Sequence, residues 1–312
     1  MLNGLKILPT NTKINFVRLR FATYILSGLV AFGSLGLFFF KGLSYGIDFK
    51  GGTMIEVRTP APLNLAKARA DLNNLNLGAI NLQEFGSPQD ILIRLEQQKG
   101  GEVDQLHAIE IVKETLGPDI EYRRIETVGP TVGSELVGNS IQAVLWALVA
   151  MLIYIWLRFE WQFGVCAILA LTHDALSILG LYSLFGLEFN LTAIVAILIT
   201  IGYSINDTVV IYDRIRENLR KFKKMAVEDV INLSINETLS RTILTSSSTL
   251  LALIALYCWG GEVISTYSLP ILVGVSVGTY SSIFLAAPLL KSFRLNIRHN
   301  EKTQEFQNAP HI

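Results

Sequence analysis

The stretch that decides the fold is LTAIVAILITIGYSINDTVVIY, residues 191–212, which is apolar throughout except for one carboxylate, Asp207. A helix of about 20 apolar residues, rising about 1.5 Å per residue, crosses the hydrocarbon layer of a bilayer. In a water-soluble protein, a surface helix of this length shows polar residues along one side. The stretch therefore predicts a membrane-spanning helix that carries an acid.

Further runs of the same character occur along the chain. Together with the first they give six predicted spans: 21–40, 140–157, 163–187, 191–212, 242–260 and 269–290. The composition agrees, because 51% of the residues are hydrophobic and only 17% are charged, whereas soluble domains have roughly a quarter charged. With 26 basic and 26 acidic residues, the chain lacks the positive surplus of a nucleic-acid binder. The composition also excludes a disordered tail, a collagen and a typical cytosolic enzyme.

The placement of Lys and Arg predicts the orientation in the membrane. Basic residues gather in four segments: the tail 1–20, the loops 158–163 and 213–241, and the tail 291–312. The short connections near Glu188 and Glu262 have no Lys or Arg. Because loops rich in Lys and Arg stay in the cytoplasm, we expect both termini there. The stretch 41–139, between the first span and the remaining five in 140–290, is expected outside.

Residues 41–139 have an ordinary soluble composition, and their apolar pattern alternates between strand and helix periods. Strands are predicted at 53–58, 80–85, 91–95 and 120–128, and helices at 63–75 and 103–116. The order is βαββαβ, which is that of the ferredoxin-like arrangement. The predicted fold is thus an α-helical integral membrane protein with six transmembrane helices and one α+β ferredoxin-like extracytoplasmic domain between helices 1 and 2.

Acids inside the spans are the first candidates for function, because a carboxylate near the bilayer centre costs about 2.5 to 3.5 kcal/mol. Asp174 lies near the middle of 163–187, on a face of small residues suited to close helix contact. A packing role and a transport role are equally open for it. Asp207 shares a helical face with Tyr203 and Ser204, and it is the stronger candidate.

Arg241 stands directly before the 242–260 span, where placing its charge in the bilayer is costly. The fourth and fifth spans are consecutive and antiparallel, so Asp207 and Arg241 are expected at similar depth, where they can pair. Taken alone, Arg241 is better explained by extending its side chain to the cytoplasmic interface.

Three other patterns favour structural roles. Hydroxyl residues fill much of 242–249, and they can bond across helices or line a hydrated path. Gly274 and Gly278 form a small-xxx-small pattern that allows close helix contact. Asp213 marks the cytoplasmic end of the fourth span and is interpreted as an interfacial anchor.

Three motifs at fixed places carry a resemblance. They are YGIDFKGGT at 45–53, VGPTVG at 128–133 and GYSINDTVVIYDRIRE at 202–217, and their motif residues are Gly46, Asp48, Gly51, Gly52, Asn206 and Asp213. The first is a glycine-rich turn in which Asp48 can bond backbone amides. Together these motifs resemble the SecF family of bacterial protein export, whose members are relatives of the RND exporters. The resemblance covers nearly the whole chain except its tails.

The resemblance implies a subunit that pairs with SecD and associates with the SecYEG channel and the SecA-associated translocon. It implies that the chain helps to pull unfolded preprotein outward with the proton gradient, as a multi-pass protein of the bacterial inner membrane. In that family the acid matching Asp207 and the arginine matching Arg241 are associated with proton passage, whereas Asp174 gains less support. Neither an enzymatic activity nor a cofactor or metal is expected.

Three alternatives stay open. The chain could be a subunit of an RND-type exporter of small molecules or lipids, although such exporters have larger outside domains. It could be an intramembrane aspartyl protease that uses Asp174 and Asp207, although Asp207 lacks the Gly-x-Gly-Asp context of those enzymes. It could also be a scaffold of the translocon that conducts nothing.

Overall fold

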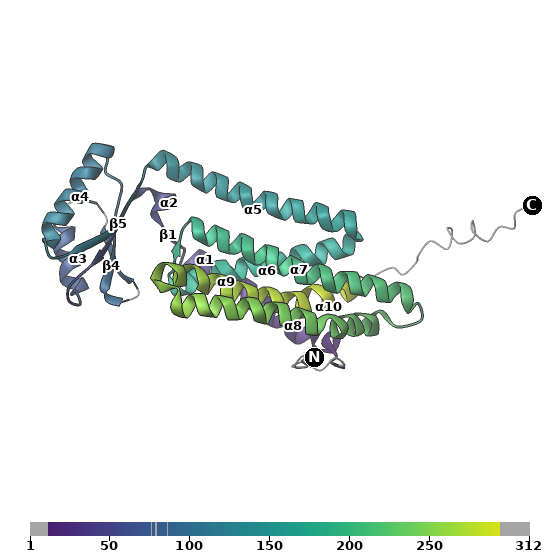
Figure 1. The fold of residues 1–312 in the computed structure, drawn as a ribbon. Coiled ribbons are helices and arrows are strands. Elements are labelled where there is room, and N and C mark those ends of the chain that lie inside the picture. The colour runs from purple at the N-terminus through teal and green to yellow at the C-terminus, as the bar shows by residue number, and fades with distance from the viewer. Residues whose placement is uncertain (1–11, 76, 79, 86, 294–312) are drawn as a thin grey trace, which may run out of the picture.

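A computed structural model describes residues 12–75, 77–78, 80–85 and 87–293 of the chain. The greater part of both expected tails, 1–20 and 291–312, lies outside the described residues. The ribbon in Figure 1 is elongated, with a helical bundle and a smaller domain at one end of it. We call that end of the bundle the domain end and the opposite one the distal end.

Within the described residues, six helices are long and apolar enough to cross a membrane, as the apolar runs predict. The first five are α1 (Phe16–Phe40), α5 (Pro130–Arg158), α6 (Trp161–Phe185), α7 (Leu191–Lys221) and α8 (Val227–Trp259). The sixth begins as α9 (Gly261–Ser281) and continues through a π-helical turn, η1 (Ser282–Ala286), into α10 (Ala287–Ser292).

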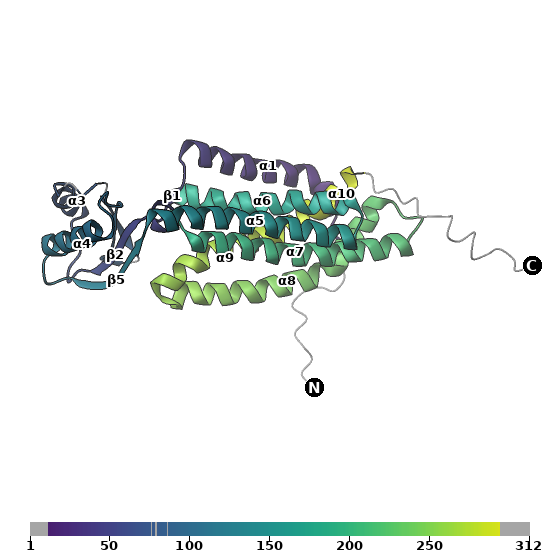
Figure 2. The same ribbon diagram turned by 90° about the horizontal axis from the view of Figure 1, so that it is seen from above.

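Three of these helices form the centre of the bundle. In the most apolar windows of α6, α7 and the sixth helix, 56%, 44% and 50% of the residues are buried, against 11% in α1, α5 and α8. Figures 1 and 2 agree, because α5 lies along one side of the bundle while α1 and α8 lie along two others. The central helices therefore hold the groups that are shielded from lipid.

The segment 213–241 was expected to be a loop, but most of it is helical. Only residues 222–226 separate α7 from α8. The two helices continue past their apolar runs because polar groups join them. Arg214 Nε donates to Glu237 Oε2 over 2.7 Å, and Asn218 Nδ2 donates to the same oxygen over 2.6 Å.

The smaller domain contains β2 (Gly52–Arg58), α3 (Leu65–Asn73), β3 (Ile80–Phe85), β4 (Ser87–Leu95), α4 (Glu102–Leu116) and β5 (Glu121–Val128). This is the βαββαβ order that the sequence predicts. The strands are antiparallel in the order β3-β4-β2-β5. The core lies between the sheet and the helices α3 and α4, where Ile55, Ile93, Leu72 and Val112 are fully buried.

A short junction joins the domain to the bundle. β1 (Ser44–Tyr45) pairs in parallel with β6 (Glu188–Phe189), which lies between α6 and α7. The chain then makes one helical turn, α2 (Ile47–Lys50), before it enters β2. Tyr45 and Phe49 pack their rings against Phe189. The junction thus connects the end of α1 to the start of α7.

Candidate functional site

Asp174 lies at the centre of the bundle and joins its three central helices. It is fully buried on α6. Its Oδ2 accepts hydrogen bonds from Ser204 Oγ on α7 over 2.6 Å and from Ser281 Oγ on α9 over 2.7 Å. Its Oδ1 lies 3.0 Å from His173 Nδ1. A buried carboxylate is tolerated when donors surround it in this way.

Two glycines allow α9 to lie against α7 at this level, as the small-xxx-small pattern predicts. A Cβ on Gly278 would lie 2.9 Å from the Cβ of Ser204, and a Cβ on Gly274 would lie 1.9 Å from Thr200 Oγ1. Any larger side chain would force the helices apart. The close approach brings the hydroxyls of α9 within reach of α7.

The π-helical turn η1 continues this polar contact. Ser282 Oγ donates to the carbonyl oxygen of Ser204 over 3.0 Å and lies 2.8 Å from Thr208 Oγ1. A π-turn inserts an extra residue into a helix and commonly occurs at functional sites. Here two successive serines bond different helices: Ser281 donates to Asp174 on α6, and Ser282 donates to Ser204 on α7.

Asp207 is held much more weakly than Asp174. It is 4% exposed on α7, and the hydrogen bond it accepts from Ser246 Oγ on α8 is 3.3 Å long. Ser246 Oγ also lies 2.8 Å from Thr279 Oγ1 on α9. Within the described residues, this long bond to α8 is the only hydrogen bond to the Asp207 carboxylate, so the helix packing depends less on it than on the carboxylate of Asp174.

The expected pairing of Asp207 with Arg241 is not formed in this structure. Arg241 is exposed on α8, and within the described part of the chain no ion pair includes it. Its neighbour Thr242 is buried, so the two side chains point to different sides of α8. The charge of Arg241 nevertheless lies close enough to Asp207 to interact with it electrostatically.

The glycine motif has a clear structural basis at the junction. Asp48 Oδ2 accepts a hydrogen bond over 3.0 Å from the backbone N–H of Leu191, the first residue of α7. Gly46 lies against Glu188, whose Oε1 would be 2.6 Å from an added Cβ. Gly51 and Gly52 have φ values of 75° and 117°, which disfavour other residues. The motif therefore ties the entry of the domain to the start of α7.

Asn206 and Asp213 lie apart from the buried carboxylates. Asn206 is exposed and lines a groove between α5 and α7. Asp213 is exposed near the distal end and accepts a hydrogen bond over 2.6 Å from Arg158 at the end of α5. Both contribute to how α7 meets α5.

Sequence reasoning identified both buried acids, Ser204 and the hydroxyl run that contains Ser246, but it missed Ser281. Ser281 belongs to the segment TYSS, residues 279–282, whose other hydroxyls, Thr279 and Ser282, contact Ser246 and Ser204. A cluster of hydroxyls one turn after Gly278 is the signal that could have found them. In an aspartyl protease the two catalytic carboxylates lie together and share a proton. No hydrogen bond in the described residues joins Asp174 to Asp207. Among those residues no His, Cys, Asp and Glu group could hold a metal.

Comparisons with known proteins agree with this architecture. The family "Protein export membrane protein SecD/SecF, C-terminal" matches residues 108–296, and "SecD/SecF GG Motif" matches residues 36–59. The protein translocase subunit SecF of Rickettsia rickettsii is 44% identical over 308 residues, which cover 96% of this chain and 98% of that protein. The SecF subunit of Rickettsia bellii is 45% identical and covers 93% of this chain and 96% of its own.

Solved structures give the same result. The crystal structure of SecDF, a translocon-associated membrane protein from Thermus thermophilus, has a TM-score of 0.82 and 35% identity over 92% of this chain. SecDF in its super-membrane-facing form has a TM-score of 0.65 and 36% identity over 96% of this chain. This chain spans 40% of the length of each SecDF chain. The chain therefore belongs to the SecD/SecF family and is a multi-pass bacterial membrane protein.

Proposed function

We propose that the chain is an auxiliary subunit of the Sec protein translocase that works with SecD to drive late preprotein export with the proton gradient. The observation that carries this proposal is Asp207, a buried carboxylate on a central helix that accepts one long hydrogen bond from the described part of the chain. Intramembrane acids that face the interior of a bundle mark proton relays in pumps and transporters. Family membership connects such a relay with protein export.

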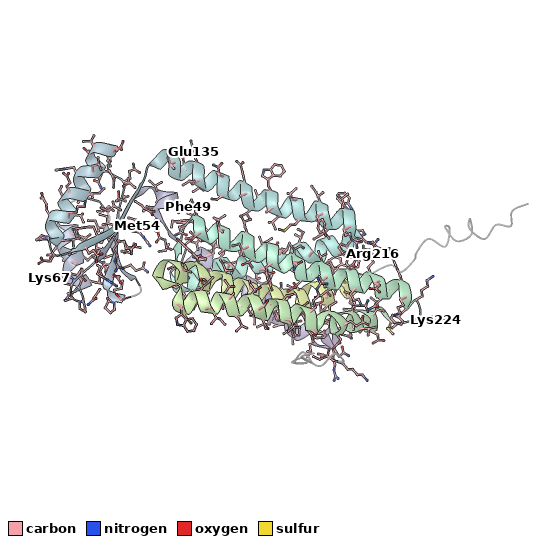
Figure 3. The ribbon with its side chains drawn as sticks, viewed as in Figure 1. Phe49, Met54, Lys67, Glu135, Arg216 and Lys224 are labelled. Atoms are coloured by element: carbon pink, nitrogen blue, oxygen red, sulfur yellow. The ribbon has the colours of Figure 1, made fainter. Side chains whose placement is uncertain are left out.

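The proposed orientation places both termini in the cytoplasm and the β-sheet domain outside. It is supported by the charge at the distal end, where α7 and the turn after it carry Arg216, Arg220, Lys221 and Lys224. Figure 3 labels Arg216 and Lys224 far from Met54 and Lys67, which lie in the domain. Because Lys and Arg are retained on the cytoplasmic side, the domain end faces outward.

In the proposed mechanism, Asp207 binds a proton in one packing of α7 against α8 and releases it in another. Only a difference in proton affinity between two packings can shift their populations. One proton that crosses the membrane supplies about 2.3 kcal/mol per 100 mV of potential. Arg241, which is unpaired with Asp207 here, is the proposed partner of the ionised carboxylate in the alternative packing.

Asp174 has a different role in this proposal. Its carboxylate accepts hydrogen bonds from Ser204 on α7 and Ser281 on α9, so it holds the three central helices together. We therefore expect a loss of folded protein, rather than a loss of coupling alone, when Asp174 is replaced. This assigns it the packing role.

The proposed partners are SecD and, through it, the SecYEG channel with SecA and the preprotein. The match to 40% of the SecDF chain and the SecF relatives support SecD as a partner. The exposed apolar faces of α1, α5 and α8 offer surfaces for that chain or for lipid, and Phe32, Trp146 and Leu251 are among their exposed residues.

The experiment that tests the proposal is preprotein export into sealed inverted vesicles that contain the translocase, SecD and this chain. Wild type, Asp207→Asn and the matched control Asp213→Asn, which alters an exposed acid of the same helix, are compared at equal expression. We expect Asp207→Asn alone to lose the part of export that an imposed proton gradient adds. Equal responses to the gradient in all three would contradict the proposal.

A further inference from the structure

One face of the sheet, which we call the open face, is not covered by α3 and α4 and is turned toward the bundle, and Leu92 and Glu56 on it are buried. Side chains alternate along a strand, so Met54, Glu56, Leu92 and Arg94 lie opposite the buried core residues. In Figure 1 the helices α3 and α4 lie on the far side of the sheet. Figure 3 shows the same arrangement, with Met54 near the junction and Lys67 on the outermost side.

A cavity of about 250 Å³ lies between this open face and the domain end of the bundle. The sheet contributes Glu56 and Glu126, and the bundle contributes Glu188, Leu191 and Thr266, among others. The open face is therefore only partly packed against the helices, so the contacts around the cavity decide how firmly the domain is held.

An ion pair crosses from the sheet to the bundle beside this cavity. The guanidinium of Arg94 on β4 donates to the carboxylate of Glu188 in β6, and the two side chains are only 12% and 16% exposed. Burial raises the pKa of the Glu188 carboxyl, Arg94 opposes that rise, and the carboxylates of Asp48 and Glu126 add to it. Arg94 is thus the group that favours the charged form of Glu188.

Glu188 is itself fixed to the start of α7. It lies three residues before Leu191, whose N–H is held by Asp48, and its backbone pairs with Ser44. Asp207 lies 16 residues after Leu191 on α7, which is about 24 Å along the helix at 1.5 Å per residue. The helix α7 therefore links the buried carboxylate to the strand β6, whose Glu188 contacts the sheet three residues before the helix begins.

We propose that Arg94 and Glu188 are positioning residues that hold the open face of the sheet on β6, directly before α7, so that the domain follows this helix when it moves. The inference rests on the proposed function in one respect, namely that movement of α7 matters for export. That the pair positions the domain is a separate statement, and it can be measured without any export assay.

The position of the domain is measured in the full chain, reconstituted with SecD in lipid nanodiscs. Spin labels are attached to Lys67→Cys on the outer side of α3 and to the native, exposed Cys258 of α8, with the buried Cys166 replaced by alanine. The variants are Glu188→Arg, Glu188→Gln, and the exchanged pair Arg94→Glu with Glu188→Arg. Glu110→Arg on the exposed side of α4 controls for the change in net charge.

We expect Glu188→Arg and Glu188→Gln to shift the distance distribution to longer values and to broaden it. The exchanged pair should restore the wild-type distribution, which a variant that merely misfolds could not do, and Glu110→Arg should leave it unchanged. An unchanged distribution in Glu188→Arg, or an exchanged pair that remains broadened, would overturn the inference.

Gradient-driven export in vesicles is the second readout. We expect it to fall to the gradient-independent level in Glu188→Arg and to return in the exchanged pair. A shifted domain together with undiminished export would show that export does not require the domain to follow α7. That result would overturn the proposed link between the Arg94–Glu188 pair and export. If wild type itself shows no gradient-dependent export, the proposed function fails while the distance measurement still decides whether the pair positions the domain.

Discussion

Replacing Gly278 with alanine adds a methyl group where α9 lies against α7. The new Cβ would lie 2.9 Å from the Cβ of Ser204 and 3.4 Å from its Cα. These atoms belong to the helix framework, so the helices must separate. Because Ser282, one turn after Gly278, donates to the carbonyl oxygen of Ser204, the separation also stretches the hydrogen bond that joins the two helices.

The expected magnitude follows from three contributions. Overpacking costs about 1 to 3 kcal/mol, and an interhelical hydrogen bond in a membrane protein contributes about 0.6 kcal/mol. Alanine is favoured over glycine inside a helix by about 1 kcal/mol, which offsets part of the loss. We therefore expect Gly278→Ala to lower the free energy of unfolding by about 0.5 to 2.5 kcal/mol.

Gly202→Ala is the matched control on α7, because an added Cβ there meets no atom within 4 Å. It should keep or slightly raise the stability. Both variants of the full chain are unfolded reversibly in mixed micelles with increasing denaturing detergent, and the loss of helix is followed by circular dichroism. If Gly278→Ala proved as stable as Gly202→Ala, the close packing of α7 and α9 described here would be refuted.

Two further predictions concern the junction and the domain. Asp48→Ala removes the acceptor for the N–H of Leu191, so it should lower the free energy of unfolding by about 1 kcal/mol and speed hydrogen exchange at the start of α7. Asp48→Asn keeps an acceptor and should change the exchange less. Equal exchange in wild type and both variants would contradict this role. Arg58 donates two hydrogen bonds of 2.8 Å to Asp90, and this holds the pKa of the Asp90 carboxyl below its usual range. The resulting stability is fully present above the unfolded pKa of about 3.9 and is lost as the pH falls through the lower folded value. Thermal unfolding of the full chain should therefore show an acid-dependent loss that Asp90→Asn reduces, and an unaltered acid limb in that variant would contradict the assignment.

The local pattern of the sequence predicts the elements of the domain closely. The strand expected at 53–58 is observed as Gly52–Arg58, and the helix expected at 103–116 is observed as Glu102–Leu116. Such elements are specified by alternating apolar residues and by Gly or Pro at their ends. The spans are equally visible, because length and hydropathy alone distinguish them.

Contacts between distant residues are less accessible to sequence reasoning. Depth along two helices places Asp207 near Arg241, but rotation by about 100° per residue decides which side chain faces inward, and Thr242 does so instead. β1 and β6 have two residues each, too few to produce a period. The donors of Asp174 come from three helices, and only the tertiary packing brings them together.

The central claim is that Asp207 exchanges a proton, and infrared difference spectroscopy tests it most directly. The full chain with SecD in lipid is titrated with pH, and the carbonyl stretch of protonated carboxylic acids is recorded for wild type, Asp207→Asn and Asp213→Asn. The account predicts a titrating band from a buried carboxylic acid that is present in wild type and Asp213→Asn and absent in Asp207→Asn. Identical spectra in wild type and Asp207→Asn would contradict it.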